Sequence, residues 1–235
     1  MSGGLWIKTP TKRYDYCMTF ISGLAANNGL LCIGDGNSFN EQGRLITNQE
    51  VKLFELSSTC VVMPDGGVMD NIYEIMEWFK STLENLAIGN KNPSVIAKCI
   101  ASTFKKARGI DKENPYGFIV AGIETLKDGE KGPILIRVDS SDWVPVQSEV
   151  PYLVGGLEEP STSFIKNGFK NDFDKTLADV MQIAINAMKV AQEYHKEIGG
   201  KISLRVIKET GIERYSAMTL DALEDNIGNN EQETI

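Results

Sequence analysis

The 235-residue sequence predicts an α+β fold, a four-layer αββα sandwich in which two antiparallel sheets pack face to face and a pair of helices covers each outer face. Two observations lead to this prediction. Apolar runs typical of strands alternate with segments of helical periodicity, in the order strands, two helices, strands, two helices, strand. A chain of this length also buries roughly 70–75% of its unfolded surface, so its core needs neither a metal ion nor a disulfide.

The chain opens with strands. Four apolar runs predict them, at residues 19–25, 30–35, 52–56 and 59–63. Asn28-Gly29 separates the first two runs, and this dipeptide favours a type I′ hairpin turn, which needs positive φ at both central residues. The polar stretch 36–49 is interpreted as a loop. The sequence therefore predicts a hairpin followed by a second pair of strands.

Two helices are predicted next. Asp70 begins a segment in which Ile72, Ile75 and Phe79 recur at helical spacing. The second helix begins at about Pro93, since proline suits the first helical turn. It ends at residues 105–109, where lysines, an arginine and a glycine favour a helix C-terminus.

The second half repeats this order. Strands are predicted at 118–123, 134–138 and 152–154, a short helix at 161–169, a long amphipathic helix at 177–197 and a final strand at 202–206. Residues 217–235 carry five acidic and no basic side chains, which predicts a solvated, partly disordered tail. The predicted domain is thus 19–216, between a leader-like segment, 1–18, and this acidic tail.

Composition and motifs exclude several classes of function. The net charge of −8 argues against sequence-independent nucleic-acid binding, and no apolar run is long enough to cross a membrane. The four cysteines form no C-x-x-C pair and are typical of free thiols in the cytoplasm. A single histidine, His195, argues against a His-rich metal site and a Ser-His-Asp triad. Gly29–Gly34 has phosphate-loop spacing, but Asp35 stands where the lysine belongs, so it is interpreted as a strand.

A set of spaced polar residues carries the functional signal. Thr19 opens the first strand, and Asp35 follows 16 residues later between two glycines. Lys52 begins the third apolar run, and Gly66-Gly67 precedes the first helix. This pattern resembles the proteasome family of N-terminal nucleophile hydrolases, and its Thr…Gly-x-x-x-x-Gly-Asp-Gly opening resembles the peptidase subunits of bacterial heat-shock proteases. The resemblance extends to about Ile207.

The resemblance implies a role for each of these residues. Thr19 is the expected nucleophile, with its own α-amine as the base, because a threonine hydroxyl needs a proton acceptor. Asp35 and Lys52 are the expected charge pair beside it, the lysine lowering the pKa of the amine. Gly66, or Gly67 if the register is shifted by one, is expected to hold the oxyanion through its N–H. Thr19 would then carry an acyl ester that water releases.

The chain departs from the family in three places. Met18, rather than glycine, precedes Thr19, so residues 1–18 must be removed, or translation must begin at Met18, before the amine is free. His195 and Ile198 occupy the positions of the aspartate and serine that orient the amine in active members. No hydroxyl occurs at Gly155-Gly156-Leu157, where the family has a serine. His195 is interpreted as a surface residue or as a substitute for the missing aspartate.

By this resemblance the chain is expected to be a threonine-type endopeptidase that cleaves unfolded polypeptides in the cytoplasm. It would work inside a self-compartmentalised ring of copies of itself, supplied by an ATPase partner. Two alternatives stay open: a catalytically inactive structural subunit of such a ring, and a small-molecule amidase of the same superfamily. No cofactor, metal ion, nucleic acid or membrane is expected to take part.

Overall fold

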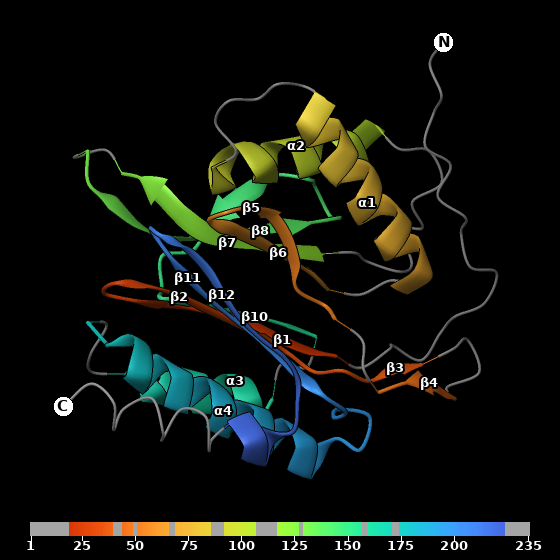
Figure 1. Cartoon of the computed structure of the whole chain (residues 1–235), viewed down its shortest axis with the longest axis vertical. Coiled ribbons are helices and arrows are strands. Elements are labelled where there is room, and N and C mark those ends of the chain that lie inside the picture. Colours follow the sequence, from red (N-terminus) through yellow and green to blue (C-terminus); the bar gives the residue numbers. More distant parts are fainter. Residues whose placement is uncertain are drawn as a thin grey trace.

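A computed structural model describes residues 19–39, 44–48, 51–65, 69–85, 92–106, 117–126, 129–156, 159–170 and 174–223. Two antiparallel five-stranded sheets lie face to face, with helices along their outer sides (Figure 1). The predicted α+β class with two antiparallel sheets is therefore confirmed. No helix in these ranges is long and apolar enough to cross a membrane.

The first sheet joins the two halves of the chain. Its order is β10 (Tyr152–Gly156), β1 (Phe20–Ala26), β2 (Gly29–Gly34), β11 (Ile202–Lys208) and β12 (Gly211–Met218). Helices α3 (Ser161–Gly168) and α4 (Leu177–Tyr194) lie beside it (Figure 1). A capping box begins α4, because the Thr176 hydroxyl accepts from the Asp179 N–H and the Asp179 carboxylate accepts from the Thr176 N–H.

The second sheet is built from the middle of the chain. Its order is β5 (Phe54–Ser57), β6 (Cys60–Asp65), β7 (Gly117–Thr125), β8 (Lys131–Asp139) and β9 (Pro145–Gln147). Helices α1 (Met69–Asn85) and α2 (Pro93–Lys106) lie beside its outer face (Figure 1). A separate two-stranded ribbon pairs β3 (Ser38–Phe39) with β4 (Leu45–Thr47).

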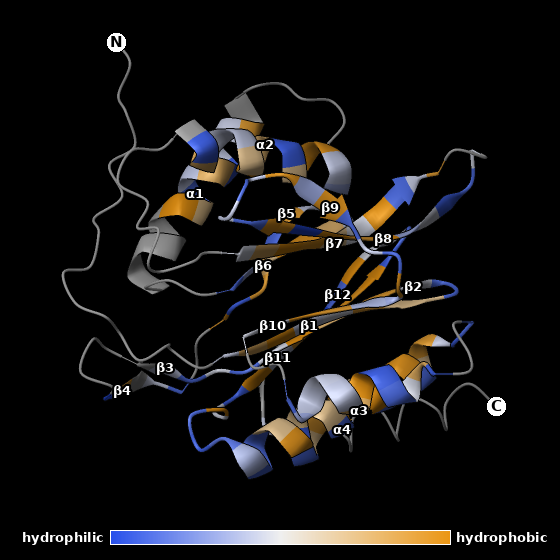
Figure 2. Ribbon diagram, turned by 180° about the vertical axis from the view of Figure 1, so that it is seen from behind, coloured by the Kyte–Doolittle hydropathy of each residue, from blue (hydrophilic) through white to orange (hydrophobic). Residues whose placement is uncertain are grey.

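The core is divided into three apolar layers. Alternate residues of β1 point to opposite sides, so Phe20 and Leu24 pack toward α3 and α4, whereas Ile21 packs between the sheets. A third layer joins the second sheet to α1 and α2. Strands buried on both faces have continuous apolar runs, which explains why β1 and β2 carry few polar residues. Figure 2 shows α4 as a mixture of hydrophobic and hydrophilic residues, as expected of a helix with one buried face.

The predicted elements form, with differences at their edges. The first hairpin is confirmed, but its loop is Asn27-Asn28 and neither residue has a positive φ, so the predicted type I′ turn is wrong. The Asn27 N–H donates to the Lys175 carbonyl oxygen at 2.9 Å, a tertiary contact that the local sequence does not reveal. The helix predicted at 177–197 ends at Tyr194.

Four strands lie where the sequence predicts none. The ribbon of β3 and β4 lies within the predicted loop 36–49, and β9 and β12 are edge strands. The strand predicted to be last, β11, is followed by β12, which runs to Met218, beyond the predicted start of the tail at residue 217. Leu223 is only 1% exposed and packs in the layer beside α3 and α4. This part of the predicted tail is thus held in place by the burial of a leucine side chain.

Candidate functional site

Thr19, Asp35 and Lys52 meet at one end of the layer between the sheets. Thr19 directly precedes β1 and Asp35 directly follows β2. These strands are antiparallel, with Ile21 opposite Gly34, so the hairpin register brings the two residues together. Lys52 precedes β5 and therefore reaches the site from the second sheet. The structure thus joins three of the four site residues predicted from the sequence.

The Asp35 carboxylate is the centre of this cluster. Its Oδ1 accepts hydrogen bonds from the Thr19 hydroxyl at 2.9 Å, the Phe20 N–H at 2.9 Å and the Lys52 ammonium at 2.7 Å. Its Oδ2 accepts from the Asn37 N–H at 3.2 Å. The nucleophile candidate and the lysine are therefore hydrogen bonded to the same oxygen atom.

The three side chains of the cluster are almost fully buried. Asp35 is 0%, Lys52 3% and Thr19 7% exposed. Charges removed from water are costly unless they are paired and hydrogen bonded, and a buried ion pair often adds little net stability. Since an apolar pair would fill the same space more cheaply, the charges at this position favour a chemical role.

Gly66 and Gly67 lie outside the described residues, so the predicted oxyanion role of Gly66 stays a prediction. Asp65, directly before them, ends β6 and is bound by Arg137 of β8 through Nη2 at 2.5 Å. Arg137 Nε also donates to Asp139 at 2.7 Å. Burial alone would lower the pKa of Arg137, but Asp65 and Asp139 raise it above its ordinary value. The residue that directly precedes Gly66 in the sequence thus belongs to a charged cluster.

Sequence analysis did not single out the cluster of Asp65, Arg137 and Asp139. Two signals could have indicated it: Arg137 and Asp139 are two residues apart, on the same side of a strand, and Asp65 adjoins the glycine pair. The cluster lies close to the first strand, because a Cβ atom on Gly155 would be 3.0 Å from both Asp65 and Ile21.

Gly156 of β10 lies opposite the start of β1, on the edge of that strand that does not pair with β2. It pairs with Phe20 and has a φ of +84°, a conformation that favours glycine. A Cβ atom at this position would lie 1.9 Å from the Thr19 carbonyl oxygen. Gly156, one of the three positions near which the family resemblance places a serine, is thus too crowded for any side chain.

His195 and Ile198 have other partners than Thr19. The ring Nε2 of His195 lies 3.1 Å from the Glu159 carbonyl oxygen, and the residue caps the C-terminus of α4. Ile198 is 4% exposed and packs in the apolar layer beside α3 and α4. The Thr19 hydroxyl, for its part, is hydrogen bonded to Asp35. Substitution of the family's aspartate by His195 gains no support from these contacts.

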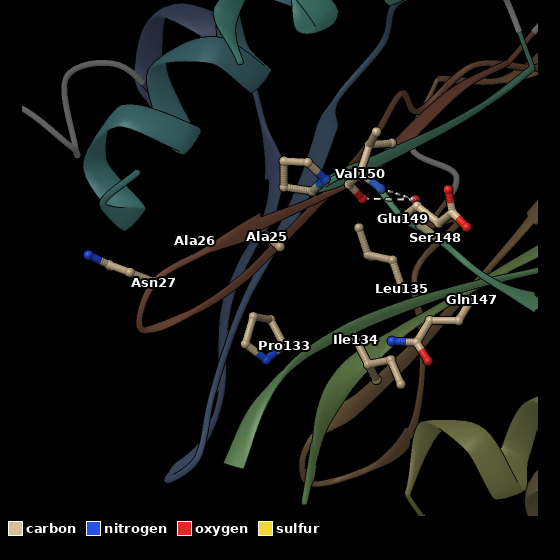
Figure 3. Close-up of a pocket in the computed structure, with 11 residues that line it drawn as sticks. Ala25, Ala26, Asn27, Pro133, Ile134, Leu135, Gln147, Ser148, Glu149 and Val150 are labelled. Atoms are coloured by element: carbon tan, nitrogen blue, oxygen red, sulfur yellow. Dashed lines mark hydrogen bonds between the residues drawn. The ribbon is translucent and has the colours of Figure 1, made fainter. Parts of the chain in front are cut away.

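A cavity is lined by residues at the C-terminal end of β1, the end opposite Thr19, and Figure 3 shows its lining side chains. Its volume is about 330 Å³, and it is lined by residues 25–27, 133–135 and 147–151. The Ser148 hydroxyl within it donates to the Val150 carbonyl oxygen at 2.8 Å. None of the predicted site residues lines it, so this cavity and the Thr19 cluster are separate features.

Three cysteines lie within the described residues, and all three are free thiols. Burial raises the pKa of the thiols of Cys32 and Cys60, which are both 0% exposed, and to a smaller extent that of Cys99. A thiol kept protonated is a poor nucleophile and a poor metal ligand. Within the described ranges no group of three His, Cys, Asp or Glu side chains could hold a metal ion.

Comparison with protein-family models and with curated proteins finds no match for this chain. What the cluster can do follows from its groups. A hydroxyl beside a buried lysine and carboxylate can become a nucleophile if a base takes its proton. In the intact chain the nitrogen of Thr19 is an amide, which has no basicity near neutral pH. A free α-amine, with a pKa of about 7.7–8.0, would supply that base.

Proposed function

We propose that this chain is a threonine-type peptidase of the proteasome family of N-terminal nucleophile hydrolases, with the family's four-layer αββα sandwich. Thr19 is its nucleophile once residues 1–18 have been removed. The observation that carries the proposal is the convergence of the Thr19 hydroxyl and the Lys52 ammonium on one oxygen of Asp35. The helix pairs α1–α2 and α3–α4 on the outer sides of the two sheets also support it (Figure 1).

The proposed reaction is acyl transfer in two steps. The free amine of Thr19 takes the hydroxyl proton while Oγ1 attacks the peptide carbonyl carbon. The C–N bond then breaks, the amine passes its proton to the leaving nitrogen, and Thr19 keeps the acyl group as an ester. Water, deprotonated by the same amine, hydrolyses this ester. Lys52 disfavours a second positive charge and so keeps the amine unprotonated, while Asp35 keeps the lysine charged and oriented.

We further propose that the substrate is unfolded polypeptide and that the working form is a cytoplasmic ring of several copies, served by an ATPase. Aromatic side chains are exposed on three helices: Trp78 of α1 is 39%, Phe164 of α3 37% and Tyr194 of α4 68% exposed. Contiguous exposed apolar patches mark surfaces that another subunit covers, whereas single exposed side chains are common, so these three residues only name positions where contacts of the proposed ring can be sought. Size measurement by light scattering tests this: a mass of one chain would contradict the ring.

A structural ring subunit without activity is the second candidate. The observation that favours it is that Ile198 points into the apolar layer and Gly156 has no side chain, so neither supplies a hydrogen bond to a Thr19 amine. In this version residues 1–18 stay attached and Thr19 only helps to order Asp35.

One experiment separates the two candidates. The assembled protein is treated with a peptide α′,β′-epoxyketone, which closes a ring with a hydroxyl and an amine of one residue, and is then analysed by intact mass and peptide mapping. The peptidase predicts a chain beginning at Thr19 with one adduct there. The Thr19→Ala variant should lose the adduct, whereas Thr125→Ala, at an exposed position, should keep it. A retained leader without an adduct would leave only the structural role.

A further inference from the structure

Asn37 follows Asp35 by two residues and binds in two directions. Its N–H donates to Asp35 Oδ2 at 3.2 Å, and its side-chain Nδ2 donates to the Glu197 carbonyl oxygen at 3.0 Å. The residue is only 9% exposed. It therefore connects the carboxylate at the centre of the site to the loop between α4 and β11.

This loop and the segment around Asp35 interlock. The Gly36 N–H donates to the Gly199 carbonyl oxygen at 2.8 Å, beside the Asn37 bond. A Cβ atom on Gly36 would lie 2.2 Å from the Lys201 carbonyl oxygen, and one on Gly200 would lie 2.7 Å from Asn37 Oδ1. The two segments touch so closely that glycine is needed on both sides of the contact.

The loop is itself anchored to the helix layer. Ile198 is buried in the apolar layer beside α3 and α4, and its N–H donates to the His195 carbonyl oxygen at 3.0 Å. The His195 ring holds the Glu159 carbonyl oxygen in turn. The packing of the core thus fixes the positions of the Glu197 and Gly199 carbonyl groups, which accept the hydrogen bonds from Asn37 and Gly36.

We propose that Asn37 is a positioning residue. Because its side chain is bound to the 197–201 loop, its main-chain N–H holds the Asp35 carboxylate in a fixed place, and Asp35 in turn orients Thr19 and Lys52. The loop acts on the site through two main-chain carbonyls, because Ile198 is turned into the core. The effect on catalysis rests on the proposed peptidase function. The effect on the geometry of Asp35 does not.

Two variants of Asn37 test the hydrogen bond from its side chain to the Glu197 carbonyl oxygen. Asn37→Asp keeps the size of the side chain but has no donor for the Glu197 carbonyl, and Asn37→Ala removes the group altogether. Asn167→Ala, at an exposed position of α3, is the matched control. Amide hydrogen exchange is followed by NMR in the assembled protein as isolated, and turnover of a fluorogenic peptide is measured as kcat and KM on the form that begins at Thr19.

In both Asn37 variants, the main-chain N–H groups of Phe20, Gly36 and residue 37 should exchange hydrogen at least tenfold faster than in the wild type. The amide of Val120, in the middle of the second sheet, should keep its rate. In an active protein kcat should fall about tenfold with KM unchanged, the equivalent of one neutral hydrogen bond. Asn167→Ala should change neither quantity.

Exchange rates at Gly36 and Phe20 that stay at the wild-type value in both variants would overturn the positioning role, whatever the turnover. So would an Asn37→Asp variant with wild-type kcat, because that side chain fills the space without donating. A wild-type protein that turns over no peptide would contradict the proposed function alone, since the exchange rates would still decide how Asp35 is held.

Discussion

Lys52, which precedes a strand of the second sheet, and Asp35, which follows a strand of the first, meet in a buried site with Nζ and Oδ1 2.7 Å apart. The pair joins the segment before β5 to the end of β2, at the edge of the apolar layer between the sheets. Such a buried pair is costly to break, because the remaining charge has no water to solvate it. Variants of one or both residues can therefore separate the contribution of the pair to the free energy of unfolding from its proposed role in the reaction.

Replacing Lys52 by methionine should destabilise the protein by about 3–5 kcal/mol, since it leaves the Asp35 carboxylate buried without its cation. The double variant Asp35→Asn, Lys52→Met should recover part of that loss, because neither charge remains. Urea unfolding measures both values. The exposed residue Lys131, replaced by methionine, should change stability by less than about 1 kcal/mol.

Activity should not follow stability in this series. If the proposed peptidase is correct, the single and the double variant should both fail to form the epoxyketone adduct, because both lack the ammonium group that is proposed to lower the pKa of the Thr19 amine. An adduct in the double variant at the wild-type rate would show that Lys52 serves folding alone.

Glu55 should give the protein part of its stability above pH 4.5. Burial by itself would raise the pKa of this carboxyl, but hydrogen bonds from Arg214 and Arg205 bring the pKa below its ordinary value of 4.5. Because the folded-state pKa is the lower one, the stabilisation is complete above the unfolded pKa and is lost as the pH falls through the folded one. Glu55→Gln should therefore lose less stability than the wild type as the pH falls below 4.5.

The measurement is the urea midpoint at several pH values from 7 to 3 for the two proteins. Glu213→Gln, which removes the exposed partner of Lys208, is the control and should retain the wild-type slope. Parallel curves for the wild type and Glu55→Gln would contradict the assigned role of the two arginines.

Gly156→Ala should distort the site, whereas Gly129→Ala should not. Both glycines have a φ near +85 to +90°, so an alanine at either position carries a similar backbone strain of about 1–2 kcal/mol. Only at Gly156 does the new Cβ meet another atom, 1.9 Å from the Thr19 carbonyl oxygen, while nothing lies within 4 Å of it at Gly129. Gly156→Ala should thus lose more stability, and the adduct at Thr19 with it.

The three described cysteines should differ in reactivity. In a Cys17→Ser background, iodoacetamide at pH 8 should label Cys99 first, because it is partly exposed, and leave Cys32 and Cys60 unlabelled until the protein unfolds. Mass mapping after short and long exposure checks this order. Early labelling of Cys32 would show that the layer between the sheets opens in the native state.

Local patterns were sufficient for much of the fold. The alternation and length of the apolar runs predicted β1, β2, β5, β6, β7, β8, β10 and β11; helical spacing predicted α1, α2 and α4, and α3 was also predicted as a short helix. The exceptions include short edge strands such as β9, Pro145–Gln147, which has three residues and a proline. Such segments become strands only because a neighbouring strand offers hydrogen bonds, and this pairing leaves no periodic signal in the chain.

The sequence by itself determined which segments bury apolar surface, and the spacing of Thr19, Asp35 and Lys52, through its resemblance to the proteasome family, made them candidate site residues. Only the tertiary structure decided what those residues touch. The bond from Asn37 to Glu197 spans 160 positions, and Arg137 reaches Asp65 across 72. Contacts over such distances depend on how the sheets and loops pack, because periodicity records which side of an element is buried and not what lies against it.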